Sequence, residues 1–327
     1  MNRAMFTPGR TAPDPETLAG LCAELAARAD DTRTIGPWQS GAFASLARHG
    51  ALAGFVPADC GGSAADEVAI LGLFAAIAER CLTTALALSH WASACRIIAA
   101  ADAGVRAARL PRLARGECPT TVGISQLSTS RRHLGVPAMR ASRADGRWRL
   151  DGLCPWVTGA DSCDTVVTGA VNDGGEPRFF VVSTKADGVD VAPPLDLLAL
   201  SGSRTSTVTF RGVEPADVIT PADGGVRTGG LATTALAVGA TRASIMLVAE
   251  ESHGRPELAA IAAGLRAEVE ELTAALATAA SQASDARARD RLRIRANGLV
   301  VRAAQAALAA SKGAGFVAGH PAERLVR

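Results

Sequence analysis

Trp156-Val157-Thr158-Gly159-Ala160 is the stretch of sequence that decides the fold, together with the segments around it. β-branched and aromatic runs lie before and after it, separated by clusters of Gly and Pro, and this pattern is typical of strands joined by turns. The clearest runs are residues 147–150, 165–168, 179–182 and 207–210. We therefore predict a central β domain over residues 120–225.

Helical sequence lies on both sides of the predicted β domain. Residues 1–119 carry apolar residues at helical spacing, such as Leu18, Leu21 and Leu25, and further helices are predicted over 66–80 and 83–101. The Ala-rich residues 226–327 contain three predicted helices, at 229–253, 256–282 and 285–312. The order of helices, strands and helices predicts an α+β fold of separately packed layers and argues against a doubly wound sheet.

Composition excludes several classes of function. The chain of 327 residues is 48% hydrophobic and 20% charged, and its net charge of +2 gives no general reason to expect nucleic acid or an anionic membrane as a partner. The apolar residues 231–249 contain Arg242 beside Thr, Ser and Gly, so we predict a buried helix there and no membrane span. Seven cysteines without a CxxC pair and no evident signal peptide predict reduced thiols and a cytoplasmic location.

The familiar motifs of other chemistries are absent from the sequence. No GxGxxG opens a helix after a strand, and there is no GxSxG, HExxH or P-loop. The five histidines are far apart in sequence and none has the spacing of metal ligands, so no metal site is predicted.

Several motifs, taken in order along the chain, resemble the acyl-CoA dehydrogenase family. Residues 52–57, Leu-Ala-Gly-Phe-Val-Pro, with Gly61-Gly62 after them, resemble the family's Gly-apolar-x-Val-Pro-x-x-x-Gly-Gly stretch, and residues 110–117 resemble its Leu-Pro-rich approach to the β domain. Residues 123–126 stand where the family has Ala-x-Thr-Glu, and residues 156–160 resemble its Trp-[Ile/Val]-Thr-[Asn/Gly]-Ala motif. The resemblance covers nearly the whole chain and implies a divergent, C-terminally short member with a central β domain between an N-terminal helical domain and a C-terminal bundle.

The resemblance implies an FAD site in the β domain, and the residue types fit one. An indole such as Trp156 can cover a large flat π-surface, although a core aromatic on a strand is the alternative. Thr158, two residues along, would face the same side and hydrogen-bond the N5 edge of the ring. The segment that would hold the rest of the flavin comprises Ile124, Ser125, Gln126 and Ser130.

Two further cofactor contacts follow from the resemblance. The family holds the flavin pyrophosphate with an Arg from a neighbouring subunit, and ungapped counting places that residue at Arg255, where an exposed Arg at a helix boundary is the alternative. Gly313 stands at the family's turn near the adenosine end. The resemblance thus also implies a homodimer or homotetramer, with dimer as the simpler expectation.

The sequence departs from the family at the catalytic base. Removing the α-proton of an acyl thioester requires a carboxylate whose pKa is raised by an apolar pocket. The family places its Glu either several residues beyond an Arg-Leu-x-Arg stretch, which here means beyond Arg327, or early in the helix that begins near Gly229. Residues 224–249 contain no Asp or Glu, so no catalytic residue is assigned.

The function therefore stays open between several hypotheses. The first is an FAD-dependent oxidoreductase of acyl-CoA dehydrogenase type that acts on an acyl group bound to CoA or to a carrier protein, or on a related small molecule. The alternatives are a flavin-dependent oxygenase of the same fold, and a non-catalytic paralogue or partner subunit that lacks the base. A module that binds acyl-CoA without FAD is the last of them.

Overall fold

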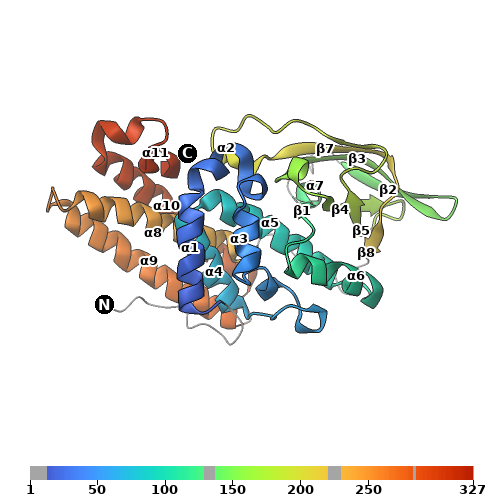
Figure 1. Cartoon of the computed structure of the whole chain (residues 1–327), viewed down its shortest axis with the longest axis horizontal. Helices are drawn as coiled ribbons and strands as arrows, with labels where there is room; N and C mark the ends of the chain where they lie inside the picture. Colours follow the sequence, from blue (N-terminus) through green and yellow to red (C-terminus); the bar gives the residue numbers. More distant parts are fainter. Residues whose placement is uncertain (1–12, 129–136, 220–229, 283–284, 327) are drawn as a thin grey trace.

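The computed structural model describes residues 13–128, 137–219, 230–282 and 285–326. Figure 1 shows the N-terminal helices in the middle of the molecule, the sheet at one end and the C-terminal helices at the other. The α+β class predicted from the sequence is confirmed. Ser130, one of the predicted cofactor contacts, lies outside the described residues.

The N-terminal helices begin where the sequence supplies capping carboxylates. The side chains of Asp14, Asp66 and Asp102 accept hydrogen bonds from backbone N–H groups in the first turns of α1, α4 and α6, which satisfies donors that the helix itself leaves open. The elements are α1 (Pro15–Ala27), α2 (Ala29–Gln39), α3 (Ala42–Arg48), the 3₁₀ turns η1 (Ala53–Phe55) and η2 (Ala58–Cys60), α4 (Glu67–Arg80), α5 (Leu82–Ala99) and α6 (Ala103–Ala114).

The sheet holds all the strands of the described residues. They are β1 (Thr120–Gly123), β2 (Met139–Ala144), β3 (Arg147–Val157), β4 (Thr165–Asn172), β5 (Pro177–Ser183), β6 (Val189–Val191), β7 (Ser206–Val213) and β8 (Asp217–Ile219). Their order is β6-β7-β3-β2-β4-β5-β8, with β1 joined in parallel to β4. The four strand runs predicted from sequence lie in β3, β4, β5 and β7, whereas the shorter strands carry too little pattern to predict.

Among the described residues, three short helical segments lie in the connections between strands of the sheet. They are α7 (Ser125–Ser128) directly after β1, η4 (Ala160–Ser162) directly after β3, and η5 (Ser201–Ser203) in the connection from β6 to β7. One hydrophobic core, which includes Phe180 and Phe210, lies within the sheet domain, and a larger one is shared by the helices and the inner strands.

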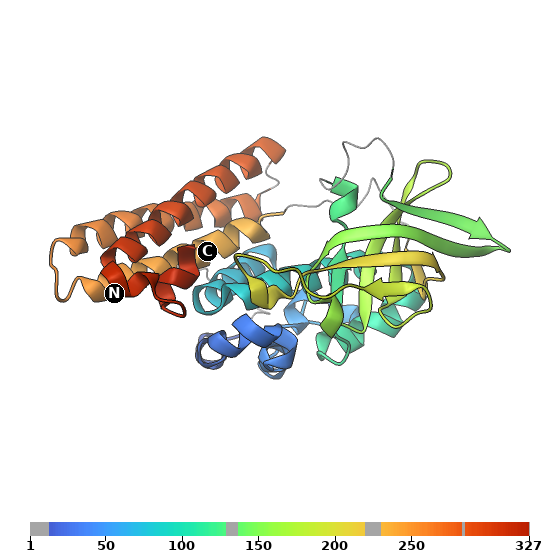
Figure 2. The same cartoon turned by 90° about the horizontal axis from the view of Figure 1, so that it is seen from above.

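The C-terminal helices form a bundle beside the N-terminal ones (Figure 2). They are α8 (Ala232–Glu251), α9 (Leu258–Ser281), α10 (Ala286–Ala310), η6 (Lys312–Phe316) and α11 (Pro321–Val326), so each long predicted helix is present and ends within three residues of its expected bounds. By length and composition α8 alone among the described helices could cross a membrane. It packs instead against α4, α9 and α10, which cover more than half of its most apolar stretch.

The contact between α4 and α8 depends on a glycine. A Cβ atom at Gly239 of α8 would lie 2.3 Å from the carbonyl oxygen of Ala75 and 2.8 Å from the backbone nitrogen of Glu79, both in α4. Such distances are too short for carbon, so only glycine permits the two helix backbones to lie this close. The helical domains on either side of the sheet sequence are joined at this point.

We predict that Gly239→Ala destabilises the protein by about 1–3 kcal/mol, because the added methyl group must push two packed helices apart. Gly264→Ala is the matched control: the position lies in α9, and no atom lies within 4 Å of the place that its Cβ would take. That change is expected to stabilise by about 0.5–1 kcal/mol through the unfolded chain. Urea unfolding midpoints measure both, and equal shifts in the two variants would contradict the close contact.

Candidate functional site

Trp156 projects from the end of β3 with its indole half exposed. Its exposed fraction is 48%, although Cys154 and Val157 on the same strand are fully buried. A large aromatic surface left open at a strand end, between buried neighbours, is the kind of surface on which a flat ligand can pack. This observation favours a binding role for Trp156 over the alternative of a core aromatic.

A glycine at the end of β1 brings the second predicted segment to the same place. A Cβ atom at Gly123 would lie 2.9 Å from Cγ2 of Val157 and 3.3 Å from Sγ of Cys154, so the β1 backbone rests directly on the end of β3. Ile124 and Ser125 follow at once, and α7 contacts β3. Two stretches more than thirty positions apart in sequence thus meet beside Trp156.

Hydrogen bonds fix the turn after β1 from its buried side. The carbonyl oxygen of Gly123 accepts from the hydroxyl of Thr168 at 2.8 Å, the amide of Gln126 at 3.2 Å and the thiol of Cys154 at 3.3 Å. The Gln126 amide also donates to the carbonyl oxygen of Gly169 at 2.9 Å. Burial raises the pKa of Cys154 to about 12, so its thiol keeps the proton that it donates. Gln126 therefore supports the turn from inside.

Thr158 does not continue the strand as the sequence pattern predicted. β3 ends at Val157, and Gly159 has a φ of 66°, which turns the chain into η4. Thr158 is consequently 2% exposed, and its Oγ1 lies 3.2 Å from Oγ1 of Thr205. Thr158 thus lies one residue beyond the end of β3, and its contact with a flavin stays a prediction.

The N-terminal domain covers the turn that follows Thr158. A Cβ atom at Gly159 would lie 2.1 Å from Cζ3 of Trp38 in α2, so the Trp38 ring packs directly against this backbone. The same ring stacks on Phe43 with centroids 4.5 Å apart. Because the Trp38 ring lies on Gly159, α2 shields the buried side of the turn from water. This contact was not predicted from sequence.

An ion pair links the two loops that flank Thr158. The guanidinium of Arg204, directly after η5, donates to a carboxylate oxygen of Asp161 in η4, with Nε at 2.7 Å and a second contact from Nη2. The pair is partly shielded from solvent, and two donors on one oxygen hold the loops more firmly than a single exposed contact would. Sequence reasoning did not single out either residue.

His90, in the middle of α5, is a titratable group that the sequence pattern did not assign to a site. Burial lowers the pKa of its imidazole from 6.5 to about 4, so the ring is neutral near pH 7. Its Nδ1 atom is shielded from solvent and has no hydrogen-bond partner among the described residues. α5 packs against β1 and α8. His90 is therefore a neutral, polar group inside the helical domains.

No carboxylate takes the place of the missing base on α8. Between Ala232 and Ala249 this helix contains no Asp or Glu, and its two glutamates come at the last turn. One of them, Glu251, is paired at 2.5 Å with Arg255. The position that the family resemblance reserved for a base on this helix is thus filled by apolar and hydroxyl side chains.

Arg255, in the connection from α8 to α9, lies close to the segment that carries Gly313, and this connection is at the end of the bundle away from the sheet (Figure 1). The Arg255 guanidinium, besides pairing with Glu251, donates to the carbonyl oxygen of Ala310 at the end of α10, and Gly313 follows in η6. Neither residue meets Trp156 within one chain. Their predicted contact with a flavin would therefore need a second copy of the protein.

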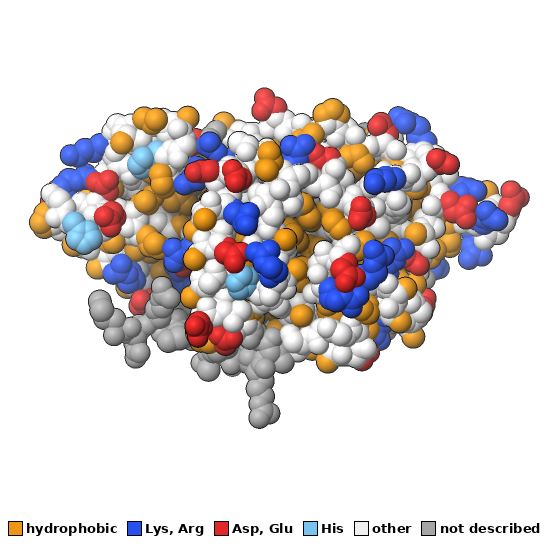
Figure 3. Space-filling model, in the orientation of Figure 1, with side chains coloured by type: hydrophobic (Ala, Val, Ile, Leu, Met, Phe, Trp, Pro, Cys, Tyr) orange, Lys and Arg blue, Asp and Glu red, His pale blue; other side chains and the backbone are white. Residues whose placement is uncertain are grey.

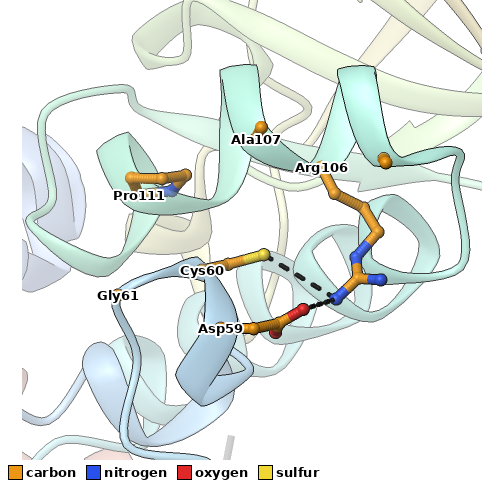
Figure 4. A pocket seen from close by; sticks show the side chains of 7 residues that line it. Asp59, Cys60, Gly61, Arg106, Ala107 and Pro111 are labelled. Atoms are coloured by element: carbon orange, nitrogen blue, oxygen red, sulfur yellow. Dashed lines mark hydrogen bonds and ion pairs between the residues drawn. The ribbon is translucent and has the colours of Figure 1, made fainter.

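A separate hollow of about 320 Å³ lies between η2 and α6, lined by residues that include Asp59, Cys60 and Arg106 (Figure 4). Arg106 donates to the Asp59 carboxylate at 2.6 Å and to the Cys60 sulfur at 3.8 Å. These contacts pair the Asp59 charge within the hollow. Among the described residues, no group of three or more His, Cys, Asp or Glu side chains could hold a metal ion.

Comparison with known proteins supports this geometry. Residues 16–117 match the family model for the N-terminal domain of acyl-CoA dehydrogenase. A solved structure of glutaryl-coenzyme A dehydrogenase with glutaryl-CoA is 17% identical, covers 94% of this chain and 88% of that chain, and has a TM-score of 0.79. The chain has the acyl-CoA dehydrogenase fold. The family resemblance drawn from the motifs is therefore confirmed.

The same fold serves flavoproteins with other activities. The nitrososynthase of Micromonospora carbonacea var. africana is 21% identical with a TM-score of 0.79, and the match covers 100% of this chain and 93% of that chain. KijD3 in complex with FMN and a dTDP-linked sugar is 22% identical with a TM-score of 0.73, covering 97% and 89%. No curated protein sequence matches the chain. At these identities the acyl-CoA dehydrogenase fold is established and the reaction is not.

We predict that His90 makes the protein less stable in acid. In the unfolded state the imidazole has a pKa near 6.5, whereas in the folded state its pKa is about 4. Between pH 6.5 and pH 4 the unfolded state therefore binds a proton that the folded state does not bind, and the free energy of unfolding falls as the pH drops. His90→Gln should reduce the loss of stability between pH 7 and pH 5 by up to about 2 kcal/mol, measured by urea unfolding.

The control for this prediction is His253→Gln, at an imidazole exposed to solvent. It should leave the pH dependence of stability unchanged. An unaltered acid slope in the His90 variant would contradict the neutral, buried state of that ring.

Proposed function

We propose that this protein is an FAD-dependent oxidoreductase of acyl-CoA dehydrogenase type, with the flavin ring packed on Trp156. The half-exposed indole at the end of β3, beside the turn Ile124–Ser125, is the observation that carries the proposal. A bound flavin would supply the acceptor or donor of a hydride or of electrons. The protein's part is to hold the ring and exclude water from it.

The residues around Trp156 fit such a ring. Ile124 and Ser125 offer backbone and hydroxyl groups at an edge, and the turn that carries them is held rigid by the three donors on the Gly123 carbonyl. Thr158 follows Trp156 by two residues, and the loops next to Thr158 are linked by the Asp161–Arg204 pair. A site held by such contacts needs little rearrangement to bind, which favours affinity.

An acyl group bound to CoA or to a carrier protein, or a related small molecule, is the proposed substrate. The structure of glutaryl-coenzyme A dehydrogenase, which shares the fold, holds glutaryl-CoA. Charges of both signs are interspersed on the face in Figure 3, in keeping with the net charge of +2 and with a small-molecule substrate rather than a nucleic acid.

The lack of a carboxylate between Ala232 and Ala249 of α8 favours a second candidate function. An oxygenase or a partner subunit of this fold does not require a base for the α-proton, and the nitrososynthase and KijD3 have the same fold. His90, half-buried and neutral near pH 7, is one of several groups that the interior shifts, since burial also raises the pKa of the Cys95, Cys154 and Cys163 thiols. Under this alternative the flavin site at Trp156 is unchanged and only the reaction differs.

The flavin proposal predicts that the purified protein binds FAD and that Trp156→Ala weakens this binding about tenfold or more, since a desolvated aromatic contact of this size is worth over 1 kcal/mol. FAD titration, followed by absorbance near ~450 nm and by quenching of Trp fluorescence, measures the affinity. FMN titrated in parallel decides between the two flavins.

Trp148→Leu is the matched control for the Trp156 variant. Trp148 lies on the same strand but packs between Arg143 and Arg178 and against Phe180, so its loss should lower stability and leave FAD affinity unchanged. Wild-type protein that binds no flavin would refute the proposal. FAD that is bound but not bleached anaerobically by any acyl thioester would favour the second candidate function.

We propose that the active form is a homodimer or larger homo-oligomer, because Arg255 and Gly313 can approach a flavin only across copies. An exposed apolar stripe on α10 offers a contact surface: Ile294 is 71% and Val301 54% exposed, with Gly298 between them. Isolated exposed side chains of this kind are ordinary, but a stripe along one helix is typical of an interface.

Val301→Glu is expected to shift the protein toward monomer and to weaken FAD binding, since a charge would be buried in the contact. Val301→Leu keeps the surface apolar and should behave as wild type. Light scattering during gel filtration gives the mass, and an unchanged mass for the Glu variant would exclude α10 as the interface.

A cytoplasmic location belongs to the same proposal. All seven cysteines are free thiols, six of them buried, which agrees with a reducing compartment. Fractionation of source cells tests the location directly.

A further inference from the structure

The hollow between η2 and α6 is lined by a cation, a carboxylate and a thiol that the proposed function does not use (Figure 4). Its volume of about 320 Å³ is within the range of small-molecule sites. It stays open because its wall on α6 includes the small residues Ala103 and Ala107, and because Gly61 has no side chain. None of its lining residues belongs to the turn beside Trp156, so the hollow is a separate site.

The Arg106 guanidinium has unused donors in this hollow. A single nitrogen, Nη2, contacts the Asp59 carboxylate at 2.6 Å and the Cys60 sulfur at 3.8 Å. The Nε atom is shielded from solvent and has no hydrogen-bond partner among the described residues. A shielded donor without an acceptor is unfavourable, and a ligand oxygen would compensate for that cost. The guanidinium can therefore accommodate a further anionic acceptor.

A carboxylate is the ligand group that suits this guanidinium. Arg binds carboxylates through a planar fork of N–H donors. The Asp59 side chain that now pairs with Arg106 is 66% exposed, and the Arg106 side chain is 29% exposed. Ion pairs with such access to water are weak, because solvent screens the charges. A ligand carboxylate can thus share the guanidinium with Asp59 or replace it.

The Cys60 thiol lies within reach of a molecule bound to Arg106. Cys60 is 7% exposed, yet it forms part of the wall of the hollow and its sulfur points toward Arg106 (Figure 4). Positive charge beside a sulfur is typical of reactive cysteines, because the thiolate is the nucleophile. Burial instead raises the pKa of Cys154 to about 12 and that of Cys163 well above its usual range, so these two thiols stay protonated. Cys60 differs from them in having both a cation and open space beside it.

We propose that the hollow binds a small disulfide that carries a carboxylate near its sulfur atoms, and that Cys60 exchanges with it. The ligand carboxylate binds the Arg106 guanidinium, which brings one sulfur of the disulfide to the Cys60 thiol. The Cys60 sulfur bonds to that sulfur, the S–S bond of the ligand breaks, and the proton lost by Cys60 passes to the departing thiol. Cys60 is left as a mixed disulfide, and an excess of the small thiol reverses the exchange. Nothing in this step requires a flavin.

Dithiodiglycolate and hydroxyethyl disulfide are the probes, because they are of similar size and only the first carries carboxylates. The purified protein should gain one mercaptoacetate group per chain from dithiodiglycolate, seen in its intact mass, and peptide mapping should place that group on Cys60. Arg106→Gln should lower the ratio of the exchange rates, dithiodiglycolate over hydroxyethyl disulfide, about tenfold. Asp59→Asn removes a competing carboxylate and should raise this ratio about twofold to fivefold.

Two further variants separate access to the hollow from the charge of Arg106. Ala107→Met narrows the hollow and keeps Arg106 and Cys60, so it should slow exchange with both disulfides alike. Cys22→Ser is the matched control, because Cys22 is partly buried and its thiol donates to the carbonyl oxygen of Ala76 at 3.7 Å, outside the hollow. It should keep the wild-type rates.

Two results would overturn the proposal. The first is wild-type protein that gains no mercaptoacetate group, or gains it on another cysteine before Cys60. The second is the same ratio of exchange rates in the wild-type and Arg106→Gln proteins. Urea unfolding midpoints show whether each variant is folded, and peptide mapping of the wild-type protein needs no variant.

Discussion

The close approach of Gly123 to the end of β3 is the contact on which the rest of the site depends. It places the first residues after β1 against Val157, so that Ile124 and Ser125 emerge beside the half-exposed Trp156. A side chain at this position would collide with Val157 and Cys154, and the turn after β1 would move away from the strand. Three donors on the Gly123 carbonyl then fix the turn, which makes its geometry independent of whether a ligand is bound.

The N-terminal helices cover the buried side of this candidate site. The Trp38 ring packs against Gly159 at the turn after Thr158, and η5 packs against α2 at Gly202. Glycine is required at both positions because another backbone or a ring takes the space of a side chain. A third glycine, Gly239, lets α8 approach α4, and this contact joins the C-terminal bundle to the N-terminal helices. The N-terminal helices thus contact the β domain at Gly159 and Gly202, and they contact the C-terminal bundle at Gly239.

The interior of the protein contains polar groups of two kinds. The hydroxyl of Thr168, the thiol of Cys154 and the amide nitrogen of Gln126 donate to the Gly123 carbonyl and hold a backbone turn. Nδ1 of His90, Oε1 of Gln126 and Nε1 of Trp38 are instead shielded from solvent and have no hydrogen-bond partner among the described residues. Buried groups of the second kind are costly to a fold, and they mark where a bound molecule or a reacting proton would compensate for the cost. His90 is of particular interest among these groups, because residues 232–249 of α8 contain no carboxylate.

The sequence by itself determined the class of fold, the three long C-terminal helices, four of the strands and the stretch around Trp156, because these features are local patterns of period, turn residues and motif order. It also determined that α8 carries no base, since that is a matter of composition. Only the tertiary structure decided that Thr158 is buried and bonded to Thr205, because a strand end at Val157 and a turn at Gly159 interrupt an alternation that the sequence pattern continues. It likewise decided the contacts of Trp38, Asp161 and Arg204, whose partners are contributed by segments distant in the chain. Which side chains are buried, and which distant residues they contact, depends on how the layers of the fold pack. These contacts cannot be predicted from local sequence patterns.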